Sequence, residues 1–273
     1  MQSEITSLRF LLMRKRTEAM IVTDKFVFVH LPRSGGTFAS EVIWKFFPSA
    51  HEVGYHLPRS LLPSEYSHLP VLGAVRNPWE FYVSWYYHVW PRDAATTLVS
   101  WVTENGKLGF TGTTRNALNL GVNNERLDAL VEMLPEQVDY QRRNIPNITK
   151  EAVMRVRDTG LGYYTFRFNH LFGNADDMFV CRLETLREDL VGFFEGIGAA
   201  TDELRDYVLH SDKQNTAEHL HYSTYYTPEL AELVLLRDRP LIERFGYVFE
   251  QASSVENGRL MSSIEEQDKE LVN

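Results

Sequence analysis

The stretch Phe26-Val27-Phe28-Val29-His30-Leu31-Pro32-Arg33-Ser34-Gly35-Gly36-Thr37 decides the fold class of this chain. Its first four residues form an unbroken run of apolar β-formers, which is typical of a strand that is buried on both faces of a sheet. Apolar residues then recur at helical spacing over residues 38–46, and Pro48 ends the pattern. The stretch therefore predicts a buried strand, a glycine-containing turn and a helix.

The turn between the predicted strand and helix has the composition of an anion-binding loop. A helix that begins directly after a buried strand points its first N–H groups and the positive end of its dipole at one place. Gly35 and Gly36 allow a ligand to approach the backbone closely, and Arg33 adds a fixed positive charge. Ser34 and Thr37 add hydroxyl donors. An ordinary strand-to-helix turn, with glycine needed only for its dihedral angles, is the alternative interpretation.

The loop lacks the lysine of the Walker A motif of nucleoside triphosphatases. That motif, GxxxxGK[ST], has lysine directly before its serine or threonine, whereas Gly36 precedes Thr37 here. The sequence therefore disfavours metal–nucleoside triphosphate chemistry, and a nucleotide-dependent kinase with a degenerate phosphate loop is kept as an alternative.

A second apolar run, residues 71–75, is followed by Arg76, Asn77 and Pro78, and then by Ser84. Asn77 can cap a helix, and Pro78 suits the first helical turn. Because neighbouring parallel strands end at the same edge of a sheet, Arg76 and Ser84 can converge on one anion beside the first loop. A guanidinium group and a hydroxyl together suit a phosphate monoester.

A third apolar run, residues 178–183, predicts another buried strand, and Thr227 with Pro228 predicts the start of a last helix. Strands that alternate with helices indicate a parallel sheet with crossover connections. We therefore expect a three-layer α/β/α fold with a central parallel sheet, in a single domain of residues 1–250. Residues 251–273 are polar and acidic, which is typical of a flexible tail.

The two motifs together resemble those of sulfotransferases that use 3′-phosphoadenosine 5′-phosphosulfate (PAPS), especially bacterial and carbohydrate-type members. Such proteins carry PxxGGT or PxSGTT after the first strand, as residues 32–37 do, and an arginine followed eight residues later by a serine, as in Arg76 and Ser84. The resemblance implies a fold like that of P-loop nucleoside triphosphatases. It also implies in-line transfer of a sulfuryl group from PAPS to a hydroxyl or amine acceptor, with adenosine 3′,5′-bisphosphate (PAP) as product.

The resemblance assigns the first loop to the 5′-phosphosulfate, with Arg33 at its bridging oxygen, and the second motif to the 3′-phosphate. The residues expected to bind PAPS are Arg33, Ser34, Gly35, Gly36, Thr37, Phe38, Arg76, Ser84 and Lys213. Lys213 is included because many family members place a loop that closes over the nucleotide before the last helix; a solvated loop is the alternative. No metal is required by such an enzyme.

Residues 50–58 contain candidates for the general base that takes the proton from the acceptor. In the family this base is a histidine or glutamate, commonly placed after the first helix or the next strand. His56 is the leading candidate because an imidazole with a pKa near 6.5 suits base catalysis at neutral pH. The expected catalytic residues are thus Arg33, His56 and His51, with Glu52 and Glu41 as carboxylate alternatives.

Composition limits the kinds of partner and the cellular compartment that we expect for this protein. A formal net charge of −9 disfavours nucleic acid as a partner, so an anion must be held by local donors. The single cysteine, Cys181, excludes an internal disulfide framework and favours a reducing compartment, so we expect a cytoplasmic protein. The apolar residues 8–13 are far fewer than the roughly 20 of a membrane span, so we expect no signal peptide or membrane span.

The acceptor is not identified by the sequence: a small molecule, a lipid and a carbohydrate all fit. A candidate basic patch for an anionic acceptor consists of Arg142, Arg143, Arg155 and Arg157, with solvated helix faces as the alternative. A module that binds a nucleotide without catalysing any reaction is a further class, beside the sulfotransferase and the kinase.

Overall fold

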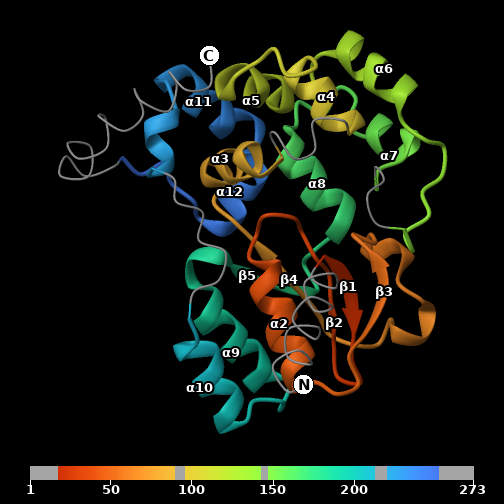
Figure 1. Cartoon of the computed structure of the whole chain (residues 1–273), viewed down its shortest axis with the longest axis vertical. Helices are drawn as coiled ribbons and strands as arrows, with labels where there is room; N and C mark the ends of the chain where they lie inside the picture. Colours follow the sequence, from red (N-terminus) through yellow and green to blue (C-terminus); the bar gives the residue numbers. More distant parts are fainter. Residues whose placement is uncertain (1–17, 90–95, 143–146, 213–219, 252–273) are drawn as a thin grey trace, which may run out of the picture.

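A five-stranded mixed sheet lies at the centre of the computed structural model, which describes residues 18–89, 96–142, 147–212 and 220–251 (Figure 1). The strands are β1 (Ala19–Val22), β2 (Val27–Phe28), β3 (His51–Tyr55), β4 (Val71–Val75) and β5 (Met178–Arg182). Their order in the sheet is β3-β1-β2-β4-β5. The protein is therefore of the α/β class.

Three of the strands are parallel neighbours, as the apolar runs predict. β4 pairs in parallel with β2 on one side and with β5 on the other. Along β2 and its flanks, Val27 and Val29 face one hydrophobic core, whereas Phe26 and Phe28 face the other. Both faces of this part of the sheet are thus covered, which explains why its strands carry no alternation of polar and apolar residues.

The other two strands correct the prediction of a parallel sheet, because β1 runs antiparallel to both β2 and β3. β1 and β2 are joined by a tight turn in which the Thr23 hydroxyl bonds to both the N–H and the carbonyl of Phe26, each at 2.9 Å. So short a connection can only reverse the chain, since a parallel pair needs a crossover of a dozen or more residues.

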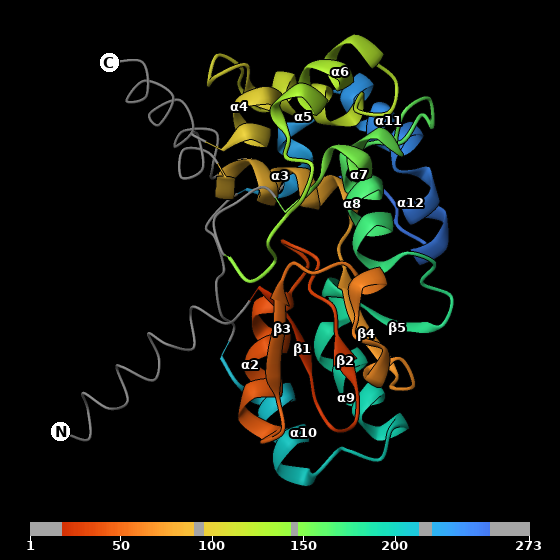
Figure 2. The same cartoon turned by 90° about the vertical axis from the view of Figure 1, so that its right-hand side faces the viewer.

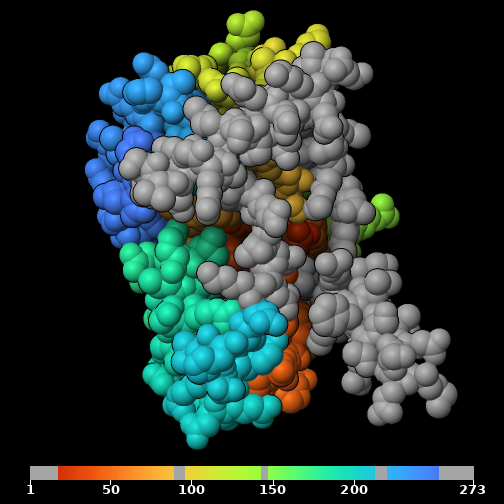
Figure 3. Space-filling model, turned by 60° about the vertical axis from the view of Figure 1, so that its left-hand side comes forward, coloured from red at the N-terminus to blue at the C-terminus, as the bar shows by residue number. Residues whose placement is uncertain are grey.

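Three helices cover one face of the sheet: α2 (Gly36–Phe46), α9 (Leu186–Gly196) and α10 (Asp202–His210). Ile43 of α2, Phe194 of α9 and Val208 of α10 pack in one core with Phe26 and Phe28. Figure 3 shows α10 and α2 side by side at the surface of the molecule.

The remaining helices gather at the end of the sheet where β4 leads into α3, and they also supply the core of the second face (Figure 2). They are α3 (Pro78–Val89), α4 (Thr97–Thr103), α5 (Phe110–Leu118), α6 (Asn124–Met133), α7 (Lys150–Met154), α8 (Tyr163–Phe172), α11 (Pro228–Arg237) and α12 (Arg239–Phe245). Short 3-10 turns are Arg59–Leu61, Ser64–Tyr66, Leu183–Thr185 and Tyr222–Tyr225.

A buried carboxylate fixes the start of α8 in this helical half. Asp238, between α11 and α12, accepts hydrogen bonds from the N–H of Thr165 at 2.9 Å and from its hydroxyl at 2.6 Å. Its other oxygen accepts a bond from the Tyr82 hydroxyl of α3 at 2.8 Å. All four helices are thereby held in one arrangement, which matters because α8 reaches down to the predicted anion-binding loop.

Within the described ranges, none of the helices combines the length and the apolar character that a membrane crossing requires. The predicted cap of the last helix is confirmed: the Thr227 hydroxyl accepts a bond from the N–H of Leu230, with Pro228 in the first turn. The expected tail lies outside the described residues except for Gln251.

Candidate anion-binding site

The loop between β2 and α2 and the first turn of α2 contain a row of unpaired backbone donors. Within the described residues, the N–H groups of residues 34–38 donate no hydrogen bond, and α2 has no side-chain cap at its start. Its N-cap is Gly35, with a φ of 87°. The row of N–H groups and the positive end of the helix dipole together form a site suited to an anion.

Both glycines of the loop are required by their surroundings. A Cβ on Gly36 would lie 1.9 Å from Cδ2 of the His30 ring, so no other residue fits without displacing that ring. Gly35 has the left-handed φ that other residues rarely adopt, and a Cβ there would lie 2.7 Å from Leu186. The close approach of His30 to Gly36 places an imidazole directly beside the predicted anion site.

The two sequence motifs meet in the structure. The guanidinium group of Arg33 donates to the Ser84 hydroxyl from Nε at 3.1 Å and from Nη2 at 2.8 Å. The Arg76 guanidinium donates from Nη1 to the backbone carbonyl of Arg33 at 3.3 Å. Two arginines and a serine, predicted from separate strands, thus form one positively charged group beside the loop.

Arg76 also has an acidic partner that the sequence motif does not reveal. Its Nη2 forms an ion pair of 2.5 Å with Glu80, one helical turn further along α3. Its Nε is buried and has no hydrogen-bond partner. One donor of Arg76 therefore remains to be satisfied, and Glu80 neutralises its charge.

Tyr164 of α8 ties the first loop to the end of β4. Its hydroxyl accepts a hydrogen bond from the Arg76 N–H at 2.8 Å and lies 3.0 Å from the Ser34 hydroxyl. The Ser34 hydroxyl also donates to the Pro32 carbonyl at 3.4 Å. Burial raises the pKa of Tyr164 far above its usual value. The buried Ser34 hydroxyl thus serves the loop itself, while its N–H remains unpaired.

A pair of histidines lies at the same edge of the sheet. His30, two residues after β2, and His56, directly after β3, stack with ring centroids 5.0 Å apart, and their Nδ1 atoms are 3.2 Å apart. One ring must donate and the other accept. The pKa of His30 is lowered to about 3 by burial and by the positive charges of Arg167 and Arg33, so this ring is neutral at physiological pH.

The other base candidates lie away from this group. His51 is at the beginning of β3, where it pairs with Val22, so it lies at the opposite end of this strand from His56. Its ring contacts the Ser49 carbonyl at 3.1 Å and the Tyr66 hydroxyl at 3.3 Å. Glu41 accepts a hydrogen bond from Tyr207 of α10. Of the two histidines predicted to be catalytic, the structure therefore brings only His56 to the loop.

The other residues predicted to bind PAPS lie at the start of α2 or outside the residues that the structure describes. Thr37 and Phe38 are in the first turn of α2 and are partly exposed. The Phe38 ring lies under the Arg187 guanidinium, 4.7 Å from its carbon, and Arg187 binds the carbonyl of Ser211 at 2.7 Å. Lys213 lies outside the described residues. Arg187 is therefore a cation near the loop that the sequence motifs do not predict.

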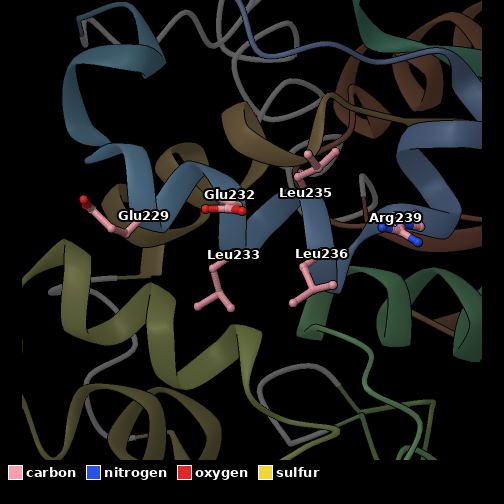
Figure 4. A pocket seen from close by; sticks show the side chains of 6 residues that line it. All are labelled: Glu229, Glu232, Leu233, Leu235, Leu236 and Arg239. Carbon is pink, nitrogen blue, oxygen red and sulfur yellow. The ribbon is translucent and has the colours of Figure 1, made fainter.

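A separate open pocket lies on the outer surface of α11 and the start of α12 (Figure 4). Its volume is about 250 Å³, and its lining is Glu229, Glu232, Leu233, Leu235, Leu236 and Arg239. None of the residues predicted to bind PAPS belongs to it.

Comparison with protein-family models, with curated proteins and with solved structures finds no match to this chain. Within the described residues, no group of three or more His, Cys, Asp or Glu side chains is placed to hold a metal ion. The chemistry of the site itself is therefore the basis for a functional proposal.

Proposed function

We propose that this protein is a sulfotransferase that moves a sulfuryl group from PAPS to a hydroxyl or amine acceptor. The observation that carries the proposal is the meeting of two anion-binding groups at one edge of the sheet. One consists of the unpaired N–H groups of residues 34–38 with Arg33, and the other of Arg76 with Ser84. A nucleotide with acidic groups on both its 5′ and 3′ oxygens matches such a pair.

The hydrogen-bond donors of the two groups are of the kinds that bind phosphate and sulfate. The loop N–H groups and Arg33 would hold the 5′-phosphosulfate, as helix N-termini hold phosphate groups. Arg76, with its buried and unpaired Nε, and the Ser84 hydroxyl would hold the 3′-phosphate. Bound PAPS would supply the sulfuryl group, whose bond to the 5′-phosphate breaks as the acceptor oxygen or nitrogen bonds to sulfur, leaving the electron pair on PAP.

Arg33 and Arg76 each have an internal partner that competes with the nucleotide. Arg33 donates hydrogen bonds to the Ser84 hydroxyl, and Glu80 forms an ion pair with the Arg76 guanidinium. Binding of a 3′-phosphate must replace at least the bond to Ser84. The Glu80 side chain is partly exposed, and a bound 3′-phosphate would replace it as the counter-ion of the buried Arg76 guanidinium.

His56 is the proposed general base. In this role its Nε2 takes the proton of the acceptor, and its Nδ1–H donates to Nδ1 of His30, the atom that lies 3.2 Å away. The neutral state of His30 allows it to accept that bond. The loop N–H groups stabilise the negative charge that develops on the leaving 5′-phosphate. A cytoplasmic location stays part of the proposal, as a prediction from composition.

Calorimetric titration with PAP tests the nucleotide site. We expect binding by the wild-type protein and affinity losses of at least tenfold in Arg76→Ala, because a charged hydrogen bond contributes roughly 1.5–3 kcal/mol. Arg205→Ala, which removes an exposed arginine paired with Glu195 and Asp202, is the matched control and should bind normally. Equal affinity of all three proteins, or no binding at all, would contradict the proposal.

Transfer of radiolabelled sulfate from PAPS to a panel of phenols, sugars, lipids and amines tests the reaction. Product formation supports the sulfotransferase. PAP binding without transfer to any acceptor favours the non-catalytic module, and magnesium-dependent turnover of ATP favours the kinase with a degenerate loop.

A further inference from the structure

Arg167, in the middle of α8, is a buried arginine that has no partner among the residues that the structure describes. It is only 3% exposed, and within the described residues its guanidinium forms neither a hydrogen bond nor an ion pair. Its Nη1 is completely buried. Charged groups in protein interiors are normally paired, because an uncompensated charge in a medium of low polarity is costly. The side chain therefore calls for an anion that the described residues do not provide.

The position of Arg167 relates it to the proposed catalytic group. It lies one helical turn beyond Tyr164, whose hydroxyl bonds to the first loop and to the N–H of Arg76. On the same helix face are Tyr163 and His170, four residues before and three after it. The charge of Arg167 acts on His30, the ring that contacts both Gly36 and His56. Arg167 thus lies on the side of the histidine pair that faces α8.

Tyr140 adds a further ring to the surroundings of Arg167. Its carbonyl accepts a hydrogen bond from the N–H of Tyr55 at 2.7 Å, directly before His56, and its side chain is within range of the Arg167 charge. Arg167 is therefore surrounded by neutral polar rings on α8, after β2 and next to β3. Such a set can hydrogen-bond an oxyanion and an adjacent hydroxyl group together.

The donors proposed for the nucleotide are complete without Arg167. The 5′ group has the loop N–H groups and Arg33, and the 3′ group has Arg76 and Ser84. An anion at Arg167 therefore belongs to the other substrate.

Resting on the proposed function, we propose that the acceptor carries an anionic group, a carboxylate, sulfate or phosphate, that Arg167 binds while the acceptor's hydroxyl or amine faces His56. The arginines that composition had indicated for such a role are already paired. Arg142 pairs with Asp139, Arg155 with Glu151 and Arg157 with Asp128, whereas Arg143 lies outside the described residues.

Inorganic sulfate, titrated into the protein saturated with PAP at constant ionic strength, tests this inference. We expect saturable binding of sulfate by the wild type and at least a tenfold loss in Arg167→Gln, with the PAP affinity changed less than about twofold. Arg126→Gln, which removes a partly buried arginine paired with Glu104, is the matched control. Equal sulfate binding by all three proteins would overturn the inference.

A second arm separates the acceptor anion from the sulfuryl group of the donor. With PAPS in place of PAP, sulfate should still bind to the wild type. If PAPS abolishes sulfate binding, or if Arg167→Gln weakens PAPS but not PAP, Arg167 holds the sulfuryl group and the acceptor inference is wrong.

A measurement on the wild type avoids dependence on the folding of the variant. Sulfate should shift the imidazole ¹⁵N resonances of His30 and His170 and leave those of the exposed His51 unchanged; unchanged His30 and His170 signals would count against the site. Failure of PAP to bind rejects the proposed function alone, because the sulfate titrations can be repeated without nucleotide and still compare Arg167→Gln with the wild type.

Discussion

The guanidinium group of Arg33 donates two hydrogen bonds to the hydroxyl of Ser84, one from Nε at 3.1 Å and one from Nη2 at 2.8 Å. These residues are 51 positions apart in the chain: Arg33 is in the loop between β2 and α2, and Ser84 is in α3. The contact joins the loop proposed for the 5′ end of the nucleotide to the serine proposed for its 3′ end. It also means that Ser84 has a partner to lose when a phosphate binds.

Replacement of Ser84 by alanine should weaken only ligands with a 3′-phosphate. A hydrogen bond to an ionised phosphate contributes roughly 1.5–3 kcal/mol, so we expect at least tenfold weaker binding of PAP and an unchanged affinity for adenosine 5′-monophosphate. Titration of both nucleotides into Ser84→Ala measures this. Equal losses for the two nucleotides would place Ser84 outside the 3′ site, and the exposed Ser67→Ala is the control.

Removal of the Glu80 charge should strengthen PAP binding. Glu80 neutralises Arg76 at 2.5 Å, so its carboxylate competes with the 3′-phosphate for the same guanidinium. We expect Glu80→Gln to bind PAP roughly three- to tenfold more tightly, equivalent to about 1 kcal/mol. Glu151→Gln, which breaks the exposed pair with Arg155 at the same helical spacing, should have no effect. Weaker binding by Glu80→Gln would mean that Glu80 orients Arg76 instead of competing for it.

Replacement of His56 should slow sulfuryl transfer without loss of nucleotide binding. Asparagine suits this position, because His56 has a φ of 45° and asparagine tolerates left-handed backbone better than most residues. A general base contributes about 10² to 10⁴ in rate, so kcat of His56→Asn should fall by that factor while the Kd for PAP stays constant. His51→Asn, at the opposite end of β3, should retain activity. A fast His56→Asn enzyme would exclude His56 as the base.

The protein should become less stable as the pH is lowered, partly because of His30. Its pKa is about 3 in the folded protein and near 6.5 in the unfolded chain. Below pH 6.5 the unfolded chain therefore takes up a proton that the folded protein refuses. The free energy of unfolding should decrease by up to about 1.4 kcal/mol per pH unit from this group until pH approaches 3.

Urea unfolding of the wild type and of His30→Gln between pH 7 and pH 4.5 measures the contribution of His30. The variant should show a shallower dependence on pH, whereas the exposed His210→Gln should keep the slope of the wild type. Identical slopes for the wild type and His30→Gln would show that His30 does not titrate in this way.

A pair of glycine substitutions separates the loop from ordinary helix effects. Gly36→Ala should destabilise the protein and abolish PAP binding, because its Cβ would overlap the His30 ring. Gly192 lies within α9 with open space around its Cα, so Gly192→Ala should raise stability by roughly 0.4–1 kcal/mol and leave binding intact. Thermal unfolding and PAP titration of both variants provide the comparison; normal PAP binding by Gly36→Ala would contradict the proposed role of the loop.

The elements that sequence patterns predicted are those with strong local signals. The apolar runs that became β2, β4 and β5 need no partner to be recognised, and Thr227 with Pro228 marks the start of α11. β1 was missed because its first two residues, Ala19 and Met20, favour a helix over a strand. β3 was missed because its residues are mostly polar and partly exposed, as suits an edge strand.

The direction of β1 and the choice between the histidines depended on pairing. His51 and His56 belong to one short segment and have similar local sequence, so no local pattern separates them. They lie at opposite ends of β3, and His30 meets only His56. The predicted parallel sheet failed for the same reason, because strand direction follows from how the ends of neighbouring strands are connected.

By itself, the sequence determined the strand, the glycine loop and the helix that present unpaired N–H groups to an anion, since apolar period and glycine chemistry act within a few residues. Only the tertiary structure decided that Arg33 meets Ser84, that Glu80 pairs with Arg76, and that Arg167 is buried near the histidine pair with no partner among the described residues. Such relationships arise from packing between helices and strands far apart in the chain, and no local pattern of residues encodes them.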